Sequence, residues 1–408
     1  MSRSYLRRTS VAALTVGLAT TLAACGGSSS SGSSGSSKGN IVVGVYAPLT
    51  GPRAPSGEAL VNGVELAAAK INAGGGINGR KLEIVKKDDQ GEASTSTSVA
   101  LELATRTKAV ATIGTYGSDL GLPSSAALER QKMPNIQPFI SAPEAGGRGF
   151  KYTFLTYPNS VNLEENTFQK AITSGVIAPK KLALVYVDGP FAVAAAEYTK
   201  QQAKTQGYEI VADEKIQSAQ ASYSSVLTKV KAAGPDAIWS ALYPAETKTI
   251  LTEMSQLKLK PKVVYTEGNQ FLDPTVVKAV GSLTEGTLTS STWWANSPVP
   301  DNQQFVAAYQ GKYSIVPGLG AAGGYQAVEV LAAALKTLKP GDISKETVRG
   351  ALASQAAADT VMGSVAFDDK GQLQYKSLFF LQTQASKEVL FLPGDRATAG
   401  AKVLSYLG

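Results

Sequence analysis

The chain has 408 residues, of which 43% are hydrophobic and 17% are charged, and its formal net charge is +7. It contains one cysteine and no histidine, which excludes an intrachain disulfide, histidine-bearing zinc sites and Ser-His-Asp or Cys-His nucleophiles. The mild positive charge is spread along the sequence, so nothing indicates a nucleic-acid partner. Hydrolysis by a carboxylate pair stays possible in principle, but no pair stands out. We therefore expect no enzyme, no metal site and no cofactor.

The N-terminus has the pattern of an export signal. Arg3, Arg7 and Arg8 precede an apolar stretch that is too short for a stable membrane span, which predicts a signal peptide over residues 1–24. The sequence Leu-Ala-Ala-Cys ending at Cys25 resembles the lipobox of bacterial lipoproteins, in which that cysteine is acylated. A Gly/Ser-rich tether at 25–39 follows. We expect an extracytoplasmic protein that meets the membrane only through a lipid anchor; a plain secretory signal with a chance cysteine is the alternative.

The chain after residue 40 alternates strand and helix patterns. Short β-branched runs bounded by turn residues predict strands, and apolar residues at helical spacing predict helices. In this first series the strands are expected at 41–45, 82–85, 109–113 and 135–140, and the helices at 59–71, 95–106 and 123–130.

A second series of the same kind follows residue 159. Its strands are expected at 182–187, 208–211, 237–239 and 263–265, and its helices at 192–205, 224–233 and 245–257. Alternating βα units predict parallel sheets covered by helices on both faces. The fold class is therefore α/β, with two doubly wound parallel-sheet lobes. Ligands of such sheets bind beyond the carboxyl ends of the strands, so the two lobes should face each other across a cleft.

Several motifs carry a family resemblance. They are Leu-Thr-Gly-Pro at 49–52, Ile-Asn-Ala-Gly-Gly-Gly-Ile-Asn-Gly-Arg at 71–80, Ser-Ala-Pro-Glu at 141–144 and Asp-Thr-Val-Met-Gly at 359–363. In this order and spacing they resemble the leucine/isoleucine/valine-binding proteins, which are type I periplasmic binding proteins of ABC importers. The resemblance implies two lobes joined by a three-crossover hinge. The N-terminal lobe would comprise 40–157 plus 292–367, and the C-terminal lobe 158–291 plus 368–408.

The same resemblance implies a ligand site. Ser118 and Ser141 match hydroxyl positions that hold the ligand carboxylate, and a helix N-terminus behind Ser118 would add free backbone N–H groups. Glu267 matches the carboxylate that receives the ligand ammonium, and Tyr243 and Phe191 match the C-terminal wall. The remaining predicted contacts are Tyr116, Gly117 and Phe139. The alternatives are capping or turn serines, a solvated loop acid and packed aromatic residues.

Some positions depart from the family pattern, so the preferred ligand side chain stays open. Phe191 replaces a tyrosine that usually closes over the ligand, and Phe139 stands where alanine is common. Trp293 and Trp294 form either an aromatic wall of the cleft or packing at the second crossover; we favour packing. Glycines at 318, 320, 323 and 324 are expected as a loop before a helix at 325–338, where they let two backbones approach or line the cleft.

We therefore predict an extracytoplasmic solute-binding lipoprotein of an ABC importer. It would be a monomer that captures a branched-chain or other small amino acid, or a similar carboxylate, and delivers it to the permease. The alternatives are the same fold binding an amide, urea or an aromatic acid, a ligand sensor that docks on a membrane receptor, and an extracytoplasmic enzyme. An aromatic acid would leave Glu267 without a cation, which separates that alternative from an amino acid.

Overall fold

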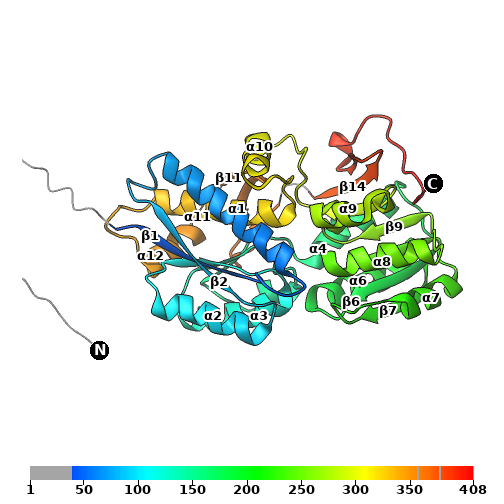
Figure 1. Cartoon of the computed structure of the whole chain (residues 1–408), viewed down its shortest axis with the longest axis horizontal. Helices are drawn as coiled ribbons and strands as arrows, with labels where there is room; N and C mark the ends of the chain where they lie inside the picture. The colour runs from blue at the N-terminus through cyan, green and yellow to red at the C-terminus, as the bar shows by residue number, and fades with distance from the viewer. Residues whose placement is uncertain (1–38, 356–357, 376–377, 408) are drawn as a thin grey trace, which may run out of the picture. The chain divides into compact units, whose positions relative to one another are not determined.

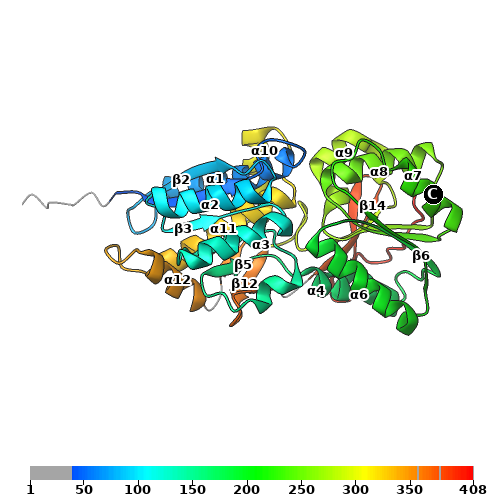
Figure 2. The same cartoon turned by 90° about the horizontal axis from the view of Figure 1, so that it is seen from below.

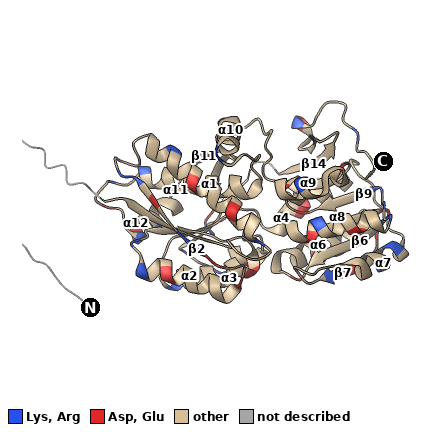
Figure 3. Cartoon of the chain, viewed as in Figure 1, with Lys and Arg blue, Asp and Glu red and all other residues tan. Residues whose placement is uncertain are grey.

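A computed structural model of the chain describes residues 39–355, 358–375 and 378–407. The expected signal peptide, Cys25 and the tether up to residue 38 lie outside the described residues. Strands and helices alternate along the described part of the chain and form mostly parallel sheets (Figure 1). Basic and acidic residues are interspersed over these elements in the view of Figure 3.

The first sheet has the strand order β2-β1-β3-β4-β5, and every neighbouring pair is parallel. The strands are β1 (Ile41–Ala47), β2 (Leu82–Asp88), β3 (Ala111–Ile113), β4 (Asn135–Gln137) and β5 (Thr153–Leu155). The strand order reverses direction between β1 and β3, so the carboxyl ends of these two strands flank the crevice where ligands of such sheets bind.

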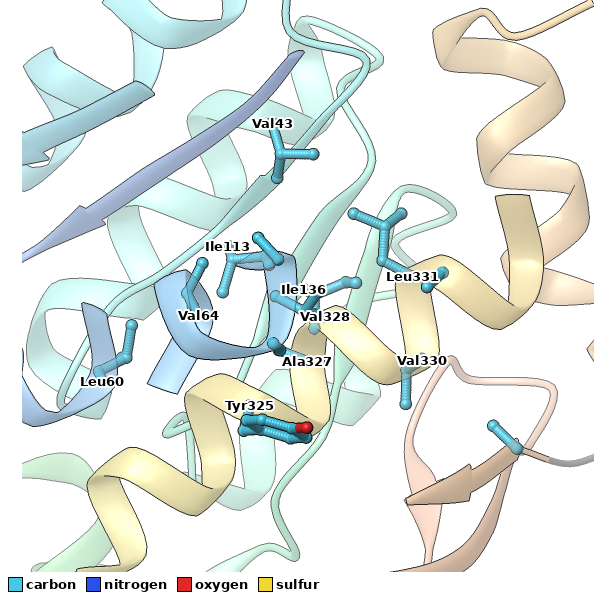
Figure 4. Packing of buried hydrophobic residues seen from close by; sticks show 14 of the residues in the cluster. Val43, Leu60, Val64, Ile113, Ile136, Tyr325, Ala327, Val328, Val330 and Leu331 are labelled. Atoms are coloured by element: carbon cyan, nitrogen blue, oxygen red, sulfur yellow. The ribbon is translucent and has the colours of Figure 1, made fainter. Parts of the chain in front are cut away.

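Helices cover both faces of the first sheet. Helices α1 (Ala54–Ala73) and α11 (Leu319–Lys336) lie on one face, and α2 (Ala93–Arg106) and α3 (Ser118–Arg130) lie side by side on the other (Figures 1 and 2). Apolar side chains from β1, β3, β4, α1 and α11 converge in the core between them (Figure 4). The shorter elements near this sheet are α10 (Asn302–Tyr313), α12 (Lys345–Ala353) and the 3-10 helix Pro143–Gly147.

The second sheet has the strand order β15-β14-β10-β9-β8-β6-β7. Its strands are β6 (Lys181–Val187), β7 (Glu209–Ile216), β8 (Ala237–Ala241), β9 (Val263–Thr266), β10 (Leu288–Ser291), β14 (Phe379–Gln384) and β15 (Lys387–Leu392). The run from Leu182 to Val187 is buried at every position, as expected for a strand between two helical layers. As far as the described residues go, the β10–β14 and β14–β15 pairs of this sheet are antiparallel and its other pairs are parallel.

Helices also cover both faces of the second sheet. Helices α7 (Ser224–Ala233), α8 (Pro244–Gln256) and α9 (Pro274–Val280) lie on one face, and α4 (Ser160–Glu164) and α6 (Pro190–Gln206) on the other (Figure 2). A π-helical segment at Glu165–Gln169 connects α4 to α5 (Lys170–Thr173). Short 3-10 helices occur at Gln270–Leu272, Gly281–Thr284 and Gly394–Arg396.

The chain crosses between the two sheets more than once. It leaves the first sheet after β5, returns to the first core after β10 at Trp293, and rejoins the second sheet at β14. A small sheet of β11 (Ala358–Thr360), β12 (Gly363–Phe367) and β13 (Leu373–Gln374) precedes this last passage. Leu373 still packs in the first core. The lobe boundaries expected at 157, 291 and 367 stay a prediction.

Two sequence expectations about helix starts are wrong. The glycines at 320, 323 and 324 lie inside α11 rather than in a loop before it. A Cβ on Gly320 or Gly324 would meet α1, and one on Gly323 would meet the Phe139 ring. A Cβ on Gly324 would lie 2.1 Å from the Leu60 carbonyl oxygen, and one on Gly63 of α1 would lie 2.0 Å from the Ala321 carbonyl oxygen. The expected close approach of two backbones is therefore confirmed.

Helix α3 also begins earlier than expected. It starts at Ser118 and contains Pro123 in its interior, whereas the sequence predicted a helix over 123–130. Gly117 adopts φ 120° and ψ 142°, a conformation that favours glycine, and this turn ends the loop after β3 and lets the helix start immediately. Ser118 is thus the first helical residue, where backbone N–H groups have no partner within the helix.

Candidate ligand site

A single cavity brings together the residues that the sequence predicted for the ligand site. Its walls include all of Tyr116, Gly117, Ser118, Phe139, Ser141, Phe191, Tyr243 and Glu267. They come from the carboxyl ends of β3, β4, β6, β8 and β9, the edges where parallel α/β sheets bind ligands. The cavity leaves about 50 Å³ for the centres of water-sized molecules. One water needs roughly 10–15 Å³ on that scale, so only a small solute fits without movement of the walls.

The face formed by the first sheet is internally hydrogen-bonded. The Ser118 Oγ accepts hydrogen bonds from the backbone N–H groups of Ser141 at 2.9 Å and Ala142 at 3.1 Å. The Ser141 Oγ donates to the Pro158 carbonyl oxygen at 3.1 Å. Ser118 therefore ties the start of α3 to the loop after β4. Within the described residues, the Ser118 hydroxyl donates to no protein acceptor, whereas the Ser141 hydroxyl does.

The face formed by the second sheet carries Glu267. This side chain is only 2% exposed, and its Oε2 has no hydrogen-bond partner within the described part of the chain. Burial, with a smaller contribution from the charge of Glu164, raises the pKa of Glu267 well above its ordinary value. The loop is fixed by two bonds, from Glu267 N to the Ser240 carbonyl oxygen at 2.7 Å and from Gly268 N to Ser290 Oγ at 2.9 Å. A buried acceptor without a partner is costly, so this carboxyl group is poised for a ligand donor.

Glu164 lies near Glu267 but is hydrogen-bonded within the protein. Its Oε1 accepts from Thr199 Oγ1 at 2.9 Å and from Gln169 Nε2 at 3.0 Å. Burial raises the pKa of Glu164 to about 7, although these hydrogen bonds oppose the shift. Glu164 therefore has a structural role, and Glu267 is the carboxyl group of the cavity that lacks a partner among the residues described.

Aromatic rings supply most of the apolar wall. Tyr116 and Phe139 lie 4.8 Å apart between ring centroids, Phe139 and Tyr157 lie 5.7 Å apart, and Phe191 and Tyr243 lie 5.4 Å apart. The Tyr116–Tyr243 pair, at 6.2 Å, joins the rings of the two faces. Burial raises the pKa of Tyr116 to about 12, so its hydroxyl stays protonated at neutral pH. The cavity thus combines ring walls with one unpaired carboxyl group.

A polar contact bridges the two faces at one edge of the cavity. Arg53, just before α1, pairs with Asp119 of α3 through Nη2–Oδ2 and Nη1–Oδ1 distances of 2.9 and 3.0 Å. Tyr243, on the loop before α8, donates its hydroxyl to Asp119 Oδ1 at 3.1 Å. The Arg53 guanidinium also lies over the Tyr243 ring, 4.2 Å from its centroid. We call these three residues the Arg53 bridge.

Gly117 lies directly beneath the Arg53 bridge. A Cβ at this position would be 2.7 Å from Asp119 Oδ1, 3.0 Å from Arg53 Nη1 and 3.1 Å from Tyr243 Oη. The backbone conformation and the lack of space therefore require glycine at position 117. The sequence placed Gly117 in the site, but the reason lies in a contact between distant segments.

Sequence reasoning missed part of the wall. Tyr157, Gly268, Gln270 and Leu319 also line the cavity. Gly268 follows the predicted Glu267, and Tyr157 ends a segment predicted for the N-terminal lobe, so their positions in the sequence could have indicated both. Leu319 begins α11, which the sequence predicted to start later. Nothing in the sequence indicated that Arg53 and Asp119 belong near the site, because their pairing depends on how α1 and α3 are placed.

No group of three or more His, Cys, Asp or Glu residues capable of holding a metal ion occurs in the described ranges. The same ranges contain no helix that is long and apolar enough to cross a membrane. Both observations concern only residues 39–355, 358–375 and 378–407.

Comparison with known proteins identifies the family. The model of a family described as periplasmic binding protein matches residues 40–388, which is most of the chain. The chain belongs to the periplasmic binding protein family. A curated relative of this periplasmic binding protein, Leu/Ile/Val-binding protein homolog 1 of Brucella melitensis, is 27% identical over 341 residues, covering 83% of this chain and 88% of the relative.

Solved structures show the same fold for this periplasmic binding protein. The branched-chain amino acid transporter substrate-binding protein LivJ of Streptococcus pneumoniae, in complex with isoleucine, has a TM-score of 0.77 at 24% identity, covering 86% of this chain and 97% of LivJ. A solute-binding protein of an ABC transporter from R. palustris, in complex with benzoate, has a TM-score of 0.78 at 22% identity, covering 86% and 96%.

These findings confirm the expected family and the two-lobed α/β fold. The members of the family are binding proteins that act outside the cytoplasm, so the protein is not an enzyme. Similarity at this level does not assign the ligand, since the two structural neighbours carry an amino acid and an aromatic acid.

Proposed function

We propose that this periplasmic binding protein captures a small L-amino acid in the ring-lined cavity and delivers it to the permease of an ABC importer. The observation that carries the proposal is Glu267, a buried carboxyl group without a partner in the described chain. A ligand ammonium would supply the missing donor and the missing counter-charge together. A group so placed gains more from a cationic partner than an exposed glutamate would, because no water competes for it.

The opposite face supports a carboxylate. The N-terminus of α3 presents backbone N–H groups and the Ser118 hydroxyl next to the cavity. A helix N-terminus favours anions, because its first N–H groups lack intrahelical partners and carry the positive end of the helix dipole. A zwitterion that spans from Ser118 to Glu267 therefore matches the charge on both faces. We infer that Ser141 supports Ser118, since its hydroxyl donates to Pro158 and its backbone N–H donates to the Ser118 Oγ.

Delivery requires a closed form that differs from the open one. A ligand held by Ser118 on one face and Glu267 on the other contacts both faces at once. Such a ligand binds the closed arrangement better than the open one and shifts the population toward it. We propose that the closed form docks on the permease as a monomer, and that acylated Cys25 holds the protein at the membrane.

One observation favours a second candidate, an aromatic carboxylic acid. Tyr116, Phe139, Tyr157, Phe191 and Tyr243 all line the cavity. The raised pKa of Glu267 would let its neutral form donate a hydrogen bond to a ligand carboxylate. The two candidates make opposite use of Glu267, as an acceptor for an ammonium or as a donor to a carboxylate.

A thermal-shift screen of the full chain tests the proposal. The panel contains the twenty amino acids, short amides, urea and aromatic acids. A ligand at a hundred times its dissociation constant stabilises the folded state by roughly 2.7 kcal/mol, which is easily measured. Shifts confined to small or aliphatic amino acids would support the proposal. Shifts only with compounds that lack an ammonium group would overturn it in favour of the second candidate.

A further inference from the structure

Phe139 limits the ring-lined cavity on the face of the first sheet. It lies in the loop after β4, where its backbone pairs with that of Tyr116 in an isolated parallel bridge. Its side chain is 9% exposed and lines the cavity, which leaves about 50 Å³ for the centres of water-sized molecules. Whether the cavity admits a larger ligand therefore depends on whether the Phe139 ring has room to move away.

Two neighbouring rings hold Phe139 from its sides. Tyr116 and Tyr157 lie against it with centroid distances of 4.8 and 5.7 Å, and both ring pairs are tilted by 45°. Tilted ring pairs are favourable, because the positive edge of one ring meets the negative face of the other. Tyr157 is itself buried, so a sideways rotation of the Phe139 ring would disturb close-packed neighbours.

The tip of the Phe139 ring rests on the backbone of α11. A Cβ on Gly323 would lie 2.5 Å from Phe139 Cζ, which is too close for two carbon atoms, so only glycine leaves room for the ring at this point. Helix α11 is in turn packed on α1 at the next residue, where a Cβ on Gly324 would lie 2.1 Å from the Leu60 carbonyl oxygen. The ring is therefore blocked on the side that faces away from the cavity.

Helix α11 forms the wall behind the ring. Leu319, one turn before Gly323 and on the same face of the helix, lines the cavity directly. The Phe139 ring thus separates the cavity from the bare backbone at Gly323. Truncating this side chain would extend the cavity as far as α11, whereas the intact ring keeps the cavity small.

The two adjacent tryptophans do not limit this cavity. Trp293 packs on Phe305 with ring centroids 5.9 Å apart, and Trp294 packs on Phe379 with centroids 4.6 Å apart. Neither tryptophan lines the ring-lined cavity. The expected packing role at the crossover is therefore confirmed, and the size of the ligand depends on other rings.

We propose that Phe139, seated on Gly323, restricts the site to amino acids with the smallest side chains, glycine and L-alanine, and excludes branched-chain ones. The inference rests on the proposed function. A zwitterion that spans from Ser118 to Glu267 occupies the polar groups of both faces, so its side chain has the ring walls left to contact. A branched side chain would have to displace a ring that has no space behind it. In a hydrophobic pocket one methylene changes the affinity by roughly 10–200-fold.

Titration calorimetry of the full chain with glycine, L-alanine, L-valine and L-leucine tests the proposal. We expect the parent to bind L-alanine more tightly than L-leucine by about tenfold or more. F139A opens the space in front of Gly323, so its dissociation constant for L-leucine should fall by about tenfold or more, while that for L-alanine should not fall. F150A is the control, because it removes the same ring from a residue that lies outside the cavity and contacts Arg148.

The outcomes separate this inference from the proposed function. Equal affinity of the parent for L-leucine and L-alanine, or an F139A variant that still prefers L-alanine, would overturn the inference and leave the proposed function standing. A gain of L-leucine binding in F191A instead of F139A would assign the size limit to the opposite wall and overturn it as well. A parent that binds none of the four amino acids would contradict the proposed function itself, and the inference would fall with it.

A methyl group at position 323 tests the contact from the other side. G323A pushes the ring toward the cavity, so L-alanine should bind more weakly by about tenfold, and glycine should lose less. The three nearest atoms to that methyl all belong to Phe139, so G323A should have little effect on binding in the F139A background. G350A is the control, at a helical glycine of α12 with nothing within 4 Å of its Cβ. An equal loss of affinity from G323A with and without the Phe139 ring would contradict the proposal.

Discussion

The two faces of the ring-lined cavity differ in how their polar groups are satisfied. On the face of the first sheet, Ser118 and Ser141 have protein partners before any ligand arrives. On the face of the second sheet, Glu267 is buried without a partner among the residues that the structure describes. The first face is thus preassembled and offers backbone groups common to many ligands. The second face requires a ligand group that can pair with a buried carboxyl group, so we expect ligand selection to depend mainly on Glu267.

Replacing Glu267 should have the largest effect on binding. E267Q keeps the shape but removes the negative charge, and losing one partner of a buried charged pair costs roughly 2–5 kcal/mol. For an amino-acid ligand the dissociation constant should therefore rise by about 30-fold or more, measured by titration calorimetry. E165Q, at an exposed position of the neighbouring π-helical segment, is the matched control. Unchanged affinity in E267Q would show that no ammonium contacts this carboxyl group.

Gly117 tests whether the two faces must approach as closely as the structure has them. G117A adds a Cβ within 2.7–3.1 Å of Asp119, Arg53 and Tyr243 and forces a non-glycine residue to φ 120°. Strain of this kind costs about 1–3 kcal/mol, so binding should weaken by about 10-fold to 100-fold. G175A is the control, since Gly175 also has positive φ but nothing within 4 Å of its Cβ. If both variants bind normally, closure does not require the Arg53 bridge geometry.

Ser118 should affect the stability of the protein as well as ligand binding. S118A leaves the buried N–H groups of Ser141 and Ala142 without their acceptor, which should lower the free energy of unfolding by about 1–3 kcal/mol. Chemical denaturation measures this loss. S98A is the control, because Ser98 is exposed on α2 and its hydroxyl returns to the Ser94 carbonyl oxygen. Equal stability of S118A and the parent would show that the first face is not preassembled by this hydroxyl.

The Arg53 bridge should have the smallest effect. Asp119 is one-third exposed, so solvent screens its pair with Arg53, and the stacking on Tyr243 adds only a modest term. R53Q should weaken ligand binding by about two- to fivefold, and the remaining affinity should depend less on salt than that of the parent. K86Q removes a surface pair with Glu65 instead and serves as the control. An identical salt dependence in R53Q and the parent would exclude the bridge from closure.

Much of the architecture was accessible from sequence because its signals are local. The buried strand at Leu182 to Val187 and the helix at Ser224–Ala233 have the apolar patterns of their element types, and both were predicted. The candidate site followed from motif order, since residues after successive parallel strands meet at one edge. The predictions that were wrong or missing concern features that depend on packing between distant segments. Gly320 and Gly324 let α11 pack closely on α1, and Arg53 joins the site only through Asp119 and Tyr243.

The pH dependence of binding tests the central claim most directly. The pKa of unliganded Glu267 is raised, so a fraction of the protein molecules carries a neutral Glu267. In those molecules the carboxyl group must release a proton before a ligand ammonium can pair with it. Calorimetry with aliphatic L-amino acids and with benzoate, between pH 5.5 and 7.5, shows whether the affinity rises or falls with pH. The account predicts that an amino acid binds more tightly as the pH rises and that binding releases a proton. Binding of benzoate alone, weakening as the pH rises, would contradict it.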